Sequence, residues 1–275
     1  PSLPSSSGYS SIYINGGQVD NKGIEASLSL NQALGPVEWN STLTYTINRN
    51  KIKKLLKPTT LKDGLLVEQD MLDLDGVGNV KTRLFEGGSV GDLYVTALRT
   101  DEHGYIDVDY VNNTVSVDGN AGERGDGWIY AGNSQAKYTM GWRNSFSWKG
   151  LTLGFLINAR VGGVCVSMTQ ALMDSYGTSK ATADARDAGG VMINGYLVPA
   201  AQKYYQTVGT GAGSMYVYSA TNIRLAELSL GYDVPVTKLV PWIKSMNVAF
   251  TGRNLFMFYC KAPYDPELTA STGTH

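Results

Sequence analysis

The stretch WNSTLTYTIN, residues 39–48, alternates between two sets of side chains along its whole length. Side chains of a β-strand point to opposite faces in turn, so Trp39, Leu43 and Tyr45 share an apolar face and the threonines share a polar one. In a soluble β-sandwich the apolar face is the core. In a membrane β-barrel the apolar face meets lipid and the polar face lines the interior.

The same two-residue period recurs along the chain. It is found in GIEASLSLN (23–31), KYTMGWRNSFSW (137–148), LTLGFLINARV (151–161), AELSLGYDV (226–234) and SMNVAFTGRNLFMF (245–258). Each stretch reaches the ~9–11 residues that a tilted strand needs to cross a bilayer. No run approaches ~18 uninterrupted apolar residues, which argues against a transmembrane helix.

The connections between these stretches alternate between short and long. Residues 31–37, 149–150 and 235–244 are short connections, and residues 49–136 and 162–221 are long ones. A sandwich gives no reason for this alternation, whereas an outer-membrane barrel has short periplasmic turns and long extracellular loops. We therefore predict an all-β fold that forms part of a transmembrane antiparallel β-barrel.

Composition and aromatic positions agree with a barrel. Charged residues make up 17% of the chain, against about 25% in soluble proteins. Aromatic residues gather near both ends of the predicted strands, which predicts two girdles at the membrane interfaces. Those near the short turns are Trp39, Trp148, Tyr232 and Trp242, and those near the long loops are Tyr138, Phe256, Phe258 and Tyr259.

Charged residues in the predicted strands follow the polar phase. An Arg or Lys facing lipid at mid-depth costs roughly 2–4 kcal/mol, so we expect these charges to face the lumen: Arg143, Arg160, Glu227, Asp233 and Arg253. Arg224 is the exception, because it shares the phase of Leu228. We expect it either above the lipid or reset to the other face by a β-bulge.

The long segments also carry elements of their own. Residues 85–99 and 104–118 predict further strands or an extracellular hairpin. Residues 168–190 have helical character, and Ser179 predicts the cap of a second short helix that ends near Gly189. Short helices in an extracellular loop are compatible with a barrel.

The chain resembles the barrel of SusC-like TonB-dependent transporters. The motifs that carry the resemblance are NGGQVDNKGIEASL, WNSTLTYTINRNKI, YTMGWRNSFSWKGLTLGFLINARVGG, LMDSYGTSKATADARDAGG, NIRLAELSLGYDVP and GRNLFMFYCKAPYDPE. They run in family order from about Ser7 to Glu267.

The resemblance implies a 22-strand barrel with an N-terminal plug in the outer membrane of a Gram-negative, Bacteroidetes-like bacterium. Residues 1–275 are then expected to be a C-terminal segment of the barrel, without the plug and the closing strand. The implied partners are TonB, a SusD-like surface lipoprotein that acts as a lid, membrane lipid and an oligosaccharide cargo, with peptides as the cargo of some members. A dimer of transporter–lid pairs is also implied.

Motifs for enzymatic or metal chemistry fail their structural requirements. GGSVG (87–91) matches G-x-S-x-G, but a nucleophile elbow needs a strand-to-helix turn and a later His, and we expect a glycine-rich strand there instead. DLDG (73–76) opens like a calcium loop, but Val77 and Leu84 occupy ligand positions. Two histidines and two distant cysteines predict no metal cluster. We expect no enzyme activity and no cofactor, and the net charge of −1 gives no case for nucleic acid.

Aromatic residues in the long loops, with one acid, are the candidate ligand-binding residues. Flat rings can stack on sugar faces while their polar groups find partners. The candidates are Asp126, Trp128, Tyr130, Tyr204, Tyr205, Tyr216 and Tyr218. Packing within the loops, or contact with the lid, is the alternative role for each ring. The sequence therefore predicts glycan import, with three alternatives: peptide import, a secreted carbohydrate-binding or hydrolytic β-sandwich, and a non-transporting outer-membrane adhesin.

Overall fold

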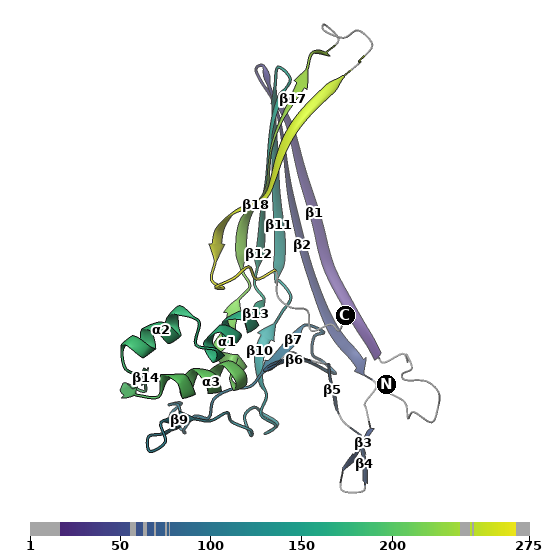
Figure 1. Ribbon diagram of the computed structural model, residues 1–275. Coiled ribbons are helices and arrows are strands. Elements are labelled where there is room, and N and C mark those ends of the chain that lie inside the picture. Colours follow the sequence, from purple (N-terminus) through teal and green to yellow (C-terminus); the bar gives the residue numbers. More distant parts are fainter. Residues whose placement is uncertain are drawn as a thin grey trace, which may run out of the picture.

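The computed structural model describes residues 17–55, 59–62, 65–68, 70–74, 76, 78–236, 243 and 245–267. Its main feature is a six-stranded antiparallel sheet in the order β1-β2-β11-β12-β17-β18. A region of short strands and helices, which we call the loop region, lies at one end of this sheet (Figure 1). In the part of the chain that the structure describes, no helix is long and apolar enough to cross a membrane.

The strands of the large sheet are the six that the two-residue period predicts. They are β1 (Gly17–Leu34), β2 (Val37–Leu55), β11 (Tyr138–Trp148), β12 (Leu151–Val161), β17 (Asn222–Val234) and β18 (Met246–Cys260). Two-residue turns join β1 to β2 and β11 to β12. Gly35, Lys149 and Gly150 take positive φ there, the backbone that tight hairpins require. All these turns lie at the end of the sheet opposite the loop region (Figure 1).

The loop region is built from the two long connections. Its short strands are β3 (Thr59–Lys62), β4 (Leu65–Glu68), β5 (Met71–Asp73), β6 (Val80–Phe85), β7 (Asp92–Val95), β8 (Val108–Asp109), β9 (Thr114–Val115), β10 (Ile129–Asn133), β13 (Val164–Val166), β14 (Val191–Ile193), β15 (Tyr196–Val198) and β16 (Val217–Ser219). Its helices are α1 (Met168–Ser175), α2 (Lys180–Asp187), α3 (Ala201–Gly211) and the 3₁₀ helix η2 (Gly213–Tyr216). The predicted helices at 168–190 are confirmed, whereas the sequence reading did not anticipate α3.

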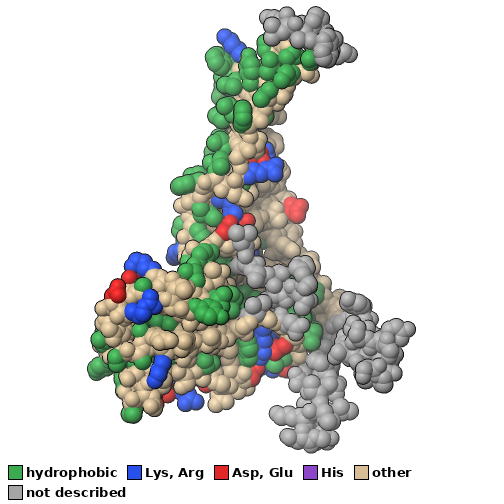
Figure 2. Space-filling model, in the orientation of Figure 1, with side chains coloured by type: hydrophobic (Ala, Val, Ile, Leu, Met, Phe, Trp, Pro, Cys, Tyr) green, Lys and Arg blue, Asp and Glu red, His purple; other side chains and the backbone are tan. Residues whose placement is uncertain are grey.

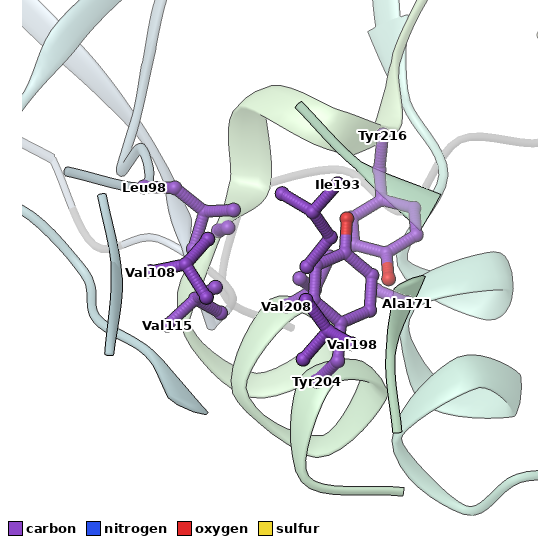
Figure 3. Close-up of a cluster of buried hydrophobic side chains, with 10 residues drawn as sticks. Leu98, Val108, Val115, Ala171, Ile193, Val198, Tyr204, Val208 and Tyr216 are labelled. Carbon is purple, nitrogen blue, oxygen red and sulfur yellow. The ribbon is translucent and has the colours of Figure 1, made fainter. Parts of the chain in front are cut away.

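Helix ends follow local rules. The Ser179 hydroxyl accepts a hydrogen bond from the Thr182 amide at 3.2 Å, which confirms the predicted cap of α2. Helices α1 and α3 pack closely where Gly209 meets α1, since a Cβ at Gly209 would lie 2.4 Å from the Ala171 carbonyl oxygen. Figure 3 shows the core that this packing completes, in which the ring of Tyr204 lies beside Val198 and Val208.

The register of the large sheet separates apolar from polar side chains. One row across the six strands is Leu28, Leu43, Trp142, Ile157, Leu225 and Phe256. The next row is Ser29, Thr42, Arg143, Leu156, Glu227 and Arg253. Apolar side chains lie exposed on the first face, with Leu28 72% exposed, and Figure 2 shows many of them over the sheet. Leu156 is the apolar member of the polar row.

The five predicted lumen-facing charges all lie on the polar face. Glu227 forms ion pairs with Arg143 at 3.4 Å and with Arg253 at 3.5 Å. Arg160 lies opposite Asn222, and Asp233 accepts a hydrogen bond from the side chain of Asn247 at 2.8 Å. That this face lines a lumen stays a prediction.

Arg224 joins the polar face because a β-bulge resets the register. On β12 the pairing passes from Glu227 to Leu225, so Ala226 is the extra residue. The guanidinium of Arg224 is buried and donates to both carboxylate oxygens of Asp265, at 2.8 and 3.1 Å. The bulge that the sequence reading offered for Arg224 is therefore confirmed.

Two of the polar side chains on the apolar face, Ser41 and Asn144, each have an indole partner. The Trp39 indole N–H donates to the Asn144 amide oxygen at 3.0 Å, and the Trp142 indole N–H donates to the Ser41 hydroxyl at 3.0 Å. An indole N–H needs a partner where water is scarce, so these pairs let tryptophans occupy this face. The predicted girdle position Trp242 lies outside the described residues.

The segregation of the two faces predicts a labelling pattern in native membranes. In a background without the two native cysteines, Asn158→Cys and Ser229→Cys are expected to react with a membrane-impermeant thiol reagent. Leu153→Cys and Leu228→Cys are expected to stay unlabelled, because those side chains meet lipid. Strong labelling at 153 and 228 with none at 158 and 229 would reverse the sidedness.

Candidate ligand-binding site

One candidate site lies where the long-loop ends of the large sheet meet the loop region. It is a cleft of about 790 Å³, which we call the mouth cleft. Its walls combine neutral hydrogen-bonding side chains, glycine backbone, two tyrosines and two cations. They include Arg49, Asn50, Ser89, Tyr130, Asn133, Gln135, Lys137, Gly163 and Tyr218. Two of the seven predicted ligand-binding residues, Tyr130 and Tyr218, thus lie in one cleft.

Asn50, near the end of β2, fixes one wall of the mouth cleft. Its amide donates to the Gln135 side-chain oxygen at 2.5 Å. Its own oxygen accepts from the Ser89 hydroxyl at 2.6 Å and from the Val90 amide at 2.9 Å. This single side chain ties the large sheet to the turn that follows β6 and to the segment that precedes β11.

Asp92 positions three residues that line the mouth cleft, although it is itself only 7% exposed. Its carboxylate accepts from the Ser89 amide at 2.8 Å, the Asn133 side chain at 2.9 Å and the Tyr130 hydroxyl at 3.2 Å. Burial of Tyr130 and the negative charge of Asp92 raise the pKa of the Tyr130 hydroxyl. The hydroxyl therefore stays protonated and keeps its ring oriented in the cleft.

A second cleft of about 540 Å³ lies on the other side of Tyr130, and Trp128 lines it, so we call it the Trp128 cleft. The ring of Trp128 is half-buried and lies 4.0 Å from the Lys81 ammonium, measured to the ring centroid. The Arg83 guanidinium lies 5.9 Å from the same ring and 5.2 Å from that of Tyr94. Such cation–aromatic contacts hold the ring in place.

Arg83 organises this second cleft, and the sequence reading missed it. Its guanidinium is 3% exposed and pairs with Asp73 at 3.0 Å and with Asp126 at 2.6 Å. Burial raises the pKa of the Asp126 carboxyl, but the hydrogen bond and charge of Arg83 outweigh burial and lower it below its usual range. Asp126 therefore has a structural ion partner. No local pattern marks Arg83, because Asp126 is distant in sequence.

The remaining predicted residues divide between a core and a third pocket. Tyr204 and Tyr216 are buried in the core of the loop region, and the Tyr216 hydroxyl donates to Asp174 at 2.9 Å (Figure 3). Both rings therefore pack within the loop region, which is the alternative role that the sequence analysis gave for each ring. Tyr205 is half-buried and lines a pocket of about 240 Å³ between the helices. The structure therefore does not bring Trp128 and Tyr205 into one cleft.

The motifs that resemble enzyme or metal sites have structural roles. Ser89 lies in a turn between β6 and β7, so the expected strand at 87–91 is wrong: Gly87 takes a φ of 89°, which turns the chain. The carboxylate of Asp73 is occupied by Lys81 and Arg83. Among the described residues, no three His, Cys, Asp or Glu side chains gather to hold a metal ion.

The fold is similar to that of the RagAB peptide transporter. The structure of the RagAB peptide transporter matches 97% of this chain with a TM-score of 0.64 and 19% identity, and this chain covers 28% of it. The RagAB peptide importer in its closed-closed and open-open states matches with a TM-score of 0.59 in each case, again at 19% identity. This likeness bears on the fold alone.

Curated relatives point to the same class. TonB-dependent receptor P26 of Formosa agariphila is 27% identical over 96% of this chain, and TonB-dependent receptor P3 of the same organism is 28% identical over 96%. No protein-family model matches the chain. The chain spans 27% of the length of both relatives. The resemblance to TonB-dependent transporters is therefore confirmed over nearly the whole chain.

The Arg83 pair predicts a stability defect confined to the loop region. Asp126→Asn removes one of two carboxylates from a buried guanidinium, so we expect a local loss of about 1–3 kcal/mol, seen as faster proteolysis between residues 70 and 133. Because the pKa of Asp126 is lowered, the wild type should show the same loss only as pH falls through that lowered pKa. Glu123→Gln, an exposed acid without an ion pair among the described residues, is the control. Equal proteolysis of both variants would contradict the role of the pair.

Proposed function

We propose that this chain is part of the barrel of a SusC-like outer-membrane transporter that imports an oligosaccharide with energy from TonB. A SusD-like surface lipoprotein is the proposed lid, and the host a Gram-negative, Bacteroidetes-like bacterium. The observation that carries the proposal is the mouth cleft, which lies at the long-loop end of a sheet with one apolar and one polar face. Cargo meeting the barrel from the loop side would reach this cleft.

The lining of the mouth cleft favours an uncharged, hydroxyl-rich cargo. Amides and hydroxyls both donate and accept hydrogen bonds, as sugar hydroxyls do. Tyr130 is 56% exposed, and a ring of this kind presents an apolar face for stacking. No Asp or Glu is among the residues that line the mouth cleft, so its wall presents no carboxylate to attract a cation.

Peptide cargo is the second candidate. It is favoured by the fold likeness to the RagAB peptide transporter. Arg49 and Lys137 in the mouth cleft would suit a peptide carboxylate. Competition separates the two candidates: displacement of a bound neutral oligosaccharide by short acidic peptides, but not by other glycans, would favour peptide import.

The edges of the large sheet support a place within a larger barrel. Strands β1 and β18 are its two edge strands. In lipid each unpaired backbone group costs several kcal/mol, so the proposal requires further strands beyond both edges.

Extraction distinguishes a membrane protein from a secreted one: recovery of the native protein in the aqueous fraction without detergent would favour a secreted sandwich. Cargo uptake that persists without TonB would contradict TonB-dependent transport. If no cargo is taken up at all, the remaining alternative is an outer-membrane adhesin.

The mouth cleft predicts where cargo affinity resides. Tyr130→Ala combined with Tyr218→Ala removes both rings, and at about 1 kcal/mol for each ring affinity for the cognate oligosaccharide should fall roughly thirtyfold. Calorimetry on the purified transporter–lid complex measures it.

The double variant Tyr105→Ala and Tyr196→Ala is the matched control, because both rings are exposed and line none of the three clefts described above. If the variant that lacks the Tyr130 and Tyr218 rings keeps its affinity for the oligosaccharide, the oligosaccharide is bound outside the mouth cleft.

A further inference from the structure

A separate pocket lies among the three α-helices of the loop region. We call it the helical pocket; its volume is about 240 Å³, and its walls include Asp174, Tyr176, Arg186, Gln202, Tyr205 and Gln206. It shares no lining residue with the mouth cleft. Any ligand here is therefore bound independently of the cargo path proposed above.

The floor of the helical pocket is rigid and electrostatically satisfied. Asp174 is 6% exposed, and its two carboxylate oxygens accept from the Gln170 side chain at 2.8 Å and from the Tyr216 hydroxyl at 2.9 Å. A carboxylate has about four acceptor positions, so it can still accept a hydrogen bond from a ligand hydroxyl. The two existing donors reduce its attraction for a free cation.

The walls are held by contacts to the backbone. The Tyr205 hydroxyl donates to the Ala181 carbonyl oxygen at 3.3 Å, which fixes the ring against α2. The Arg186 guanidinium donates to the Gly177 carbonyl oxygen at 2.8 Å, which anchors this side chain beside the end of α1. Walls fixed in this way lose little conformational entropy when a ligand binds.

The rim of the helical pocket carries an exposed aromatic ring and two side-chain amides. The ring of Tyr176 is 76% exposed. The side-chain amides of Gln202 and Gln206 form no hydrogen bond within the described residues, and successive turns of α3 place them on one side of that helix. The groups that can bind a ligand in this pocket are an exposed aromatic ring, two side-chain amides, the hydrogen-bonded acid Asp174 and the anchored guanidinium of Arg186.

We propose that the helical pocket binds one residue of a neutral saccharide on the extracellular surface, apart from the transport cleft. The Tyr176 ring stacks on the sugar face, and the two amides and Asp174 bind its hydroxyls. Amides donate and accept in equal measure, which matches a polyol better than an anion. A pocket that encloses a single small ring suits anchoring of a glycan chain rather than its passage.

Saturation-transfer NMR on the full-length transporter in detergent tests this site. The probes are the methyl glycosides of glucose, mannose, galactose and N-acetylglucosamine. We expect saturation transfer to at least one sugar, which binds weakly. The affinity for that sugar should fall about tenfold or more in Tyr176→Ala and in Gln206→Ala, because a few residues carry most of the binding energy of a small ligand. Both side chains are on the surface, so folding should be unaffected.

Two controls locate the effect. Tyr196 is a tyrosine outside the helical pocket and is also highly exposed, so Tyr196→Ala should bind the probe as the wild type does. The variant that lacks Tyr130 and Tyr218 should also retain the signal, which separates this site from the mouth cleft. No signal for any probe, or a signal unchanged in Tyr176→Ala, overturns the proposal. Tighter binding of glycinamide than of any glycoside would overturn the saccharide assignment.

Discussion

The structure depends on the register in which the six long strands pair. Side chains alternate with a period of two, so a slip of one residue would exchange the two faces of a strand. The two-residue turn at Lys149 and Gly150 fixes the pairing of β11 with β12. The bulge at Ala226, one of several register shifts in the sheet, leaves Leu228 on the apolar face and turns Arg224 to the polar one.

The loop region is stabilised differently, because it holds several buried charges beside its hydrophobic core. Arg83, Asp92 and Asp174 are each at least nine-tenths buried, and each has at least two polar partners. Buried charges without partners would cost several kcal/mol each. These networks therefore hold long connections in one conformation and leave clefts between rigid walls.

The large sheet and the mouth cleft share residues. Asn50 belongs to β2, yet its side chain positions Ser89 and Gln135, which come from two different parts of the loop region. Tyr130 lines both the mouth cleft and the Trp128 cleft. A change in the ends of the long strands is therefore transmitted directly to the candidate binding surface, without any intermediate element.

The sequence alone determined the long strands, their two faces, the alternation of short and long connections and the cap at Ser179, because each depends on side-chain period or on residues a few positions apart. Tertiary structure decided which aromatic residues face a cleft: Tyr130 and Tyr218 meet in one, whereas Tyr204 and Tyr216 fill a core. It also decided the role of Arg83, whose partner Asp126 is 43 positions away along the chain. Burial and long-range ion pairs arise only when distant segments pack together, and no local pattern encodes which segments do so.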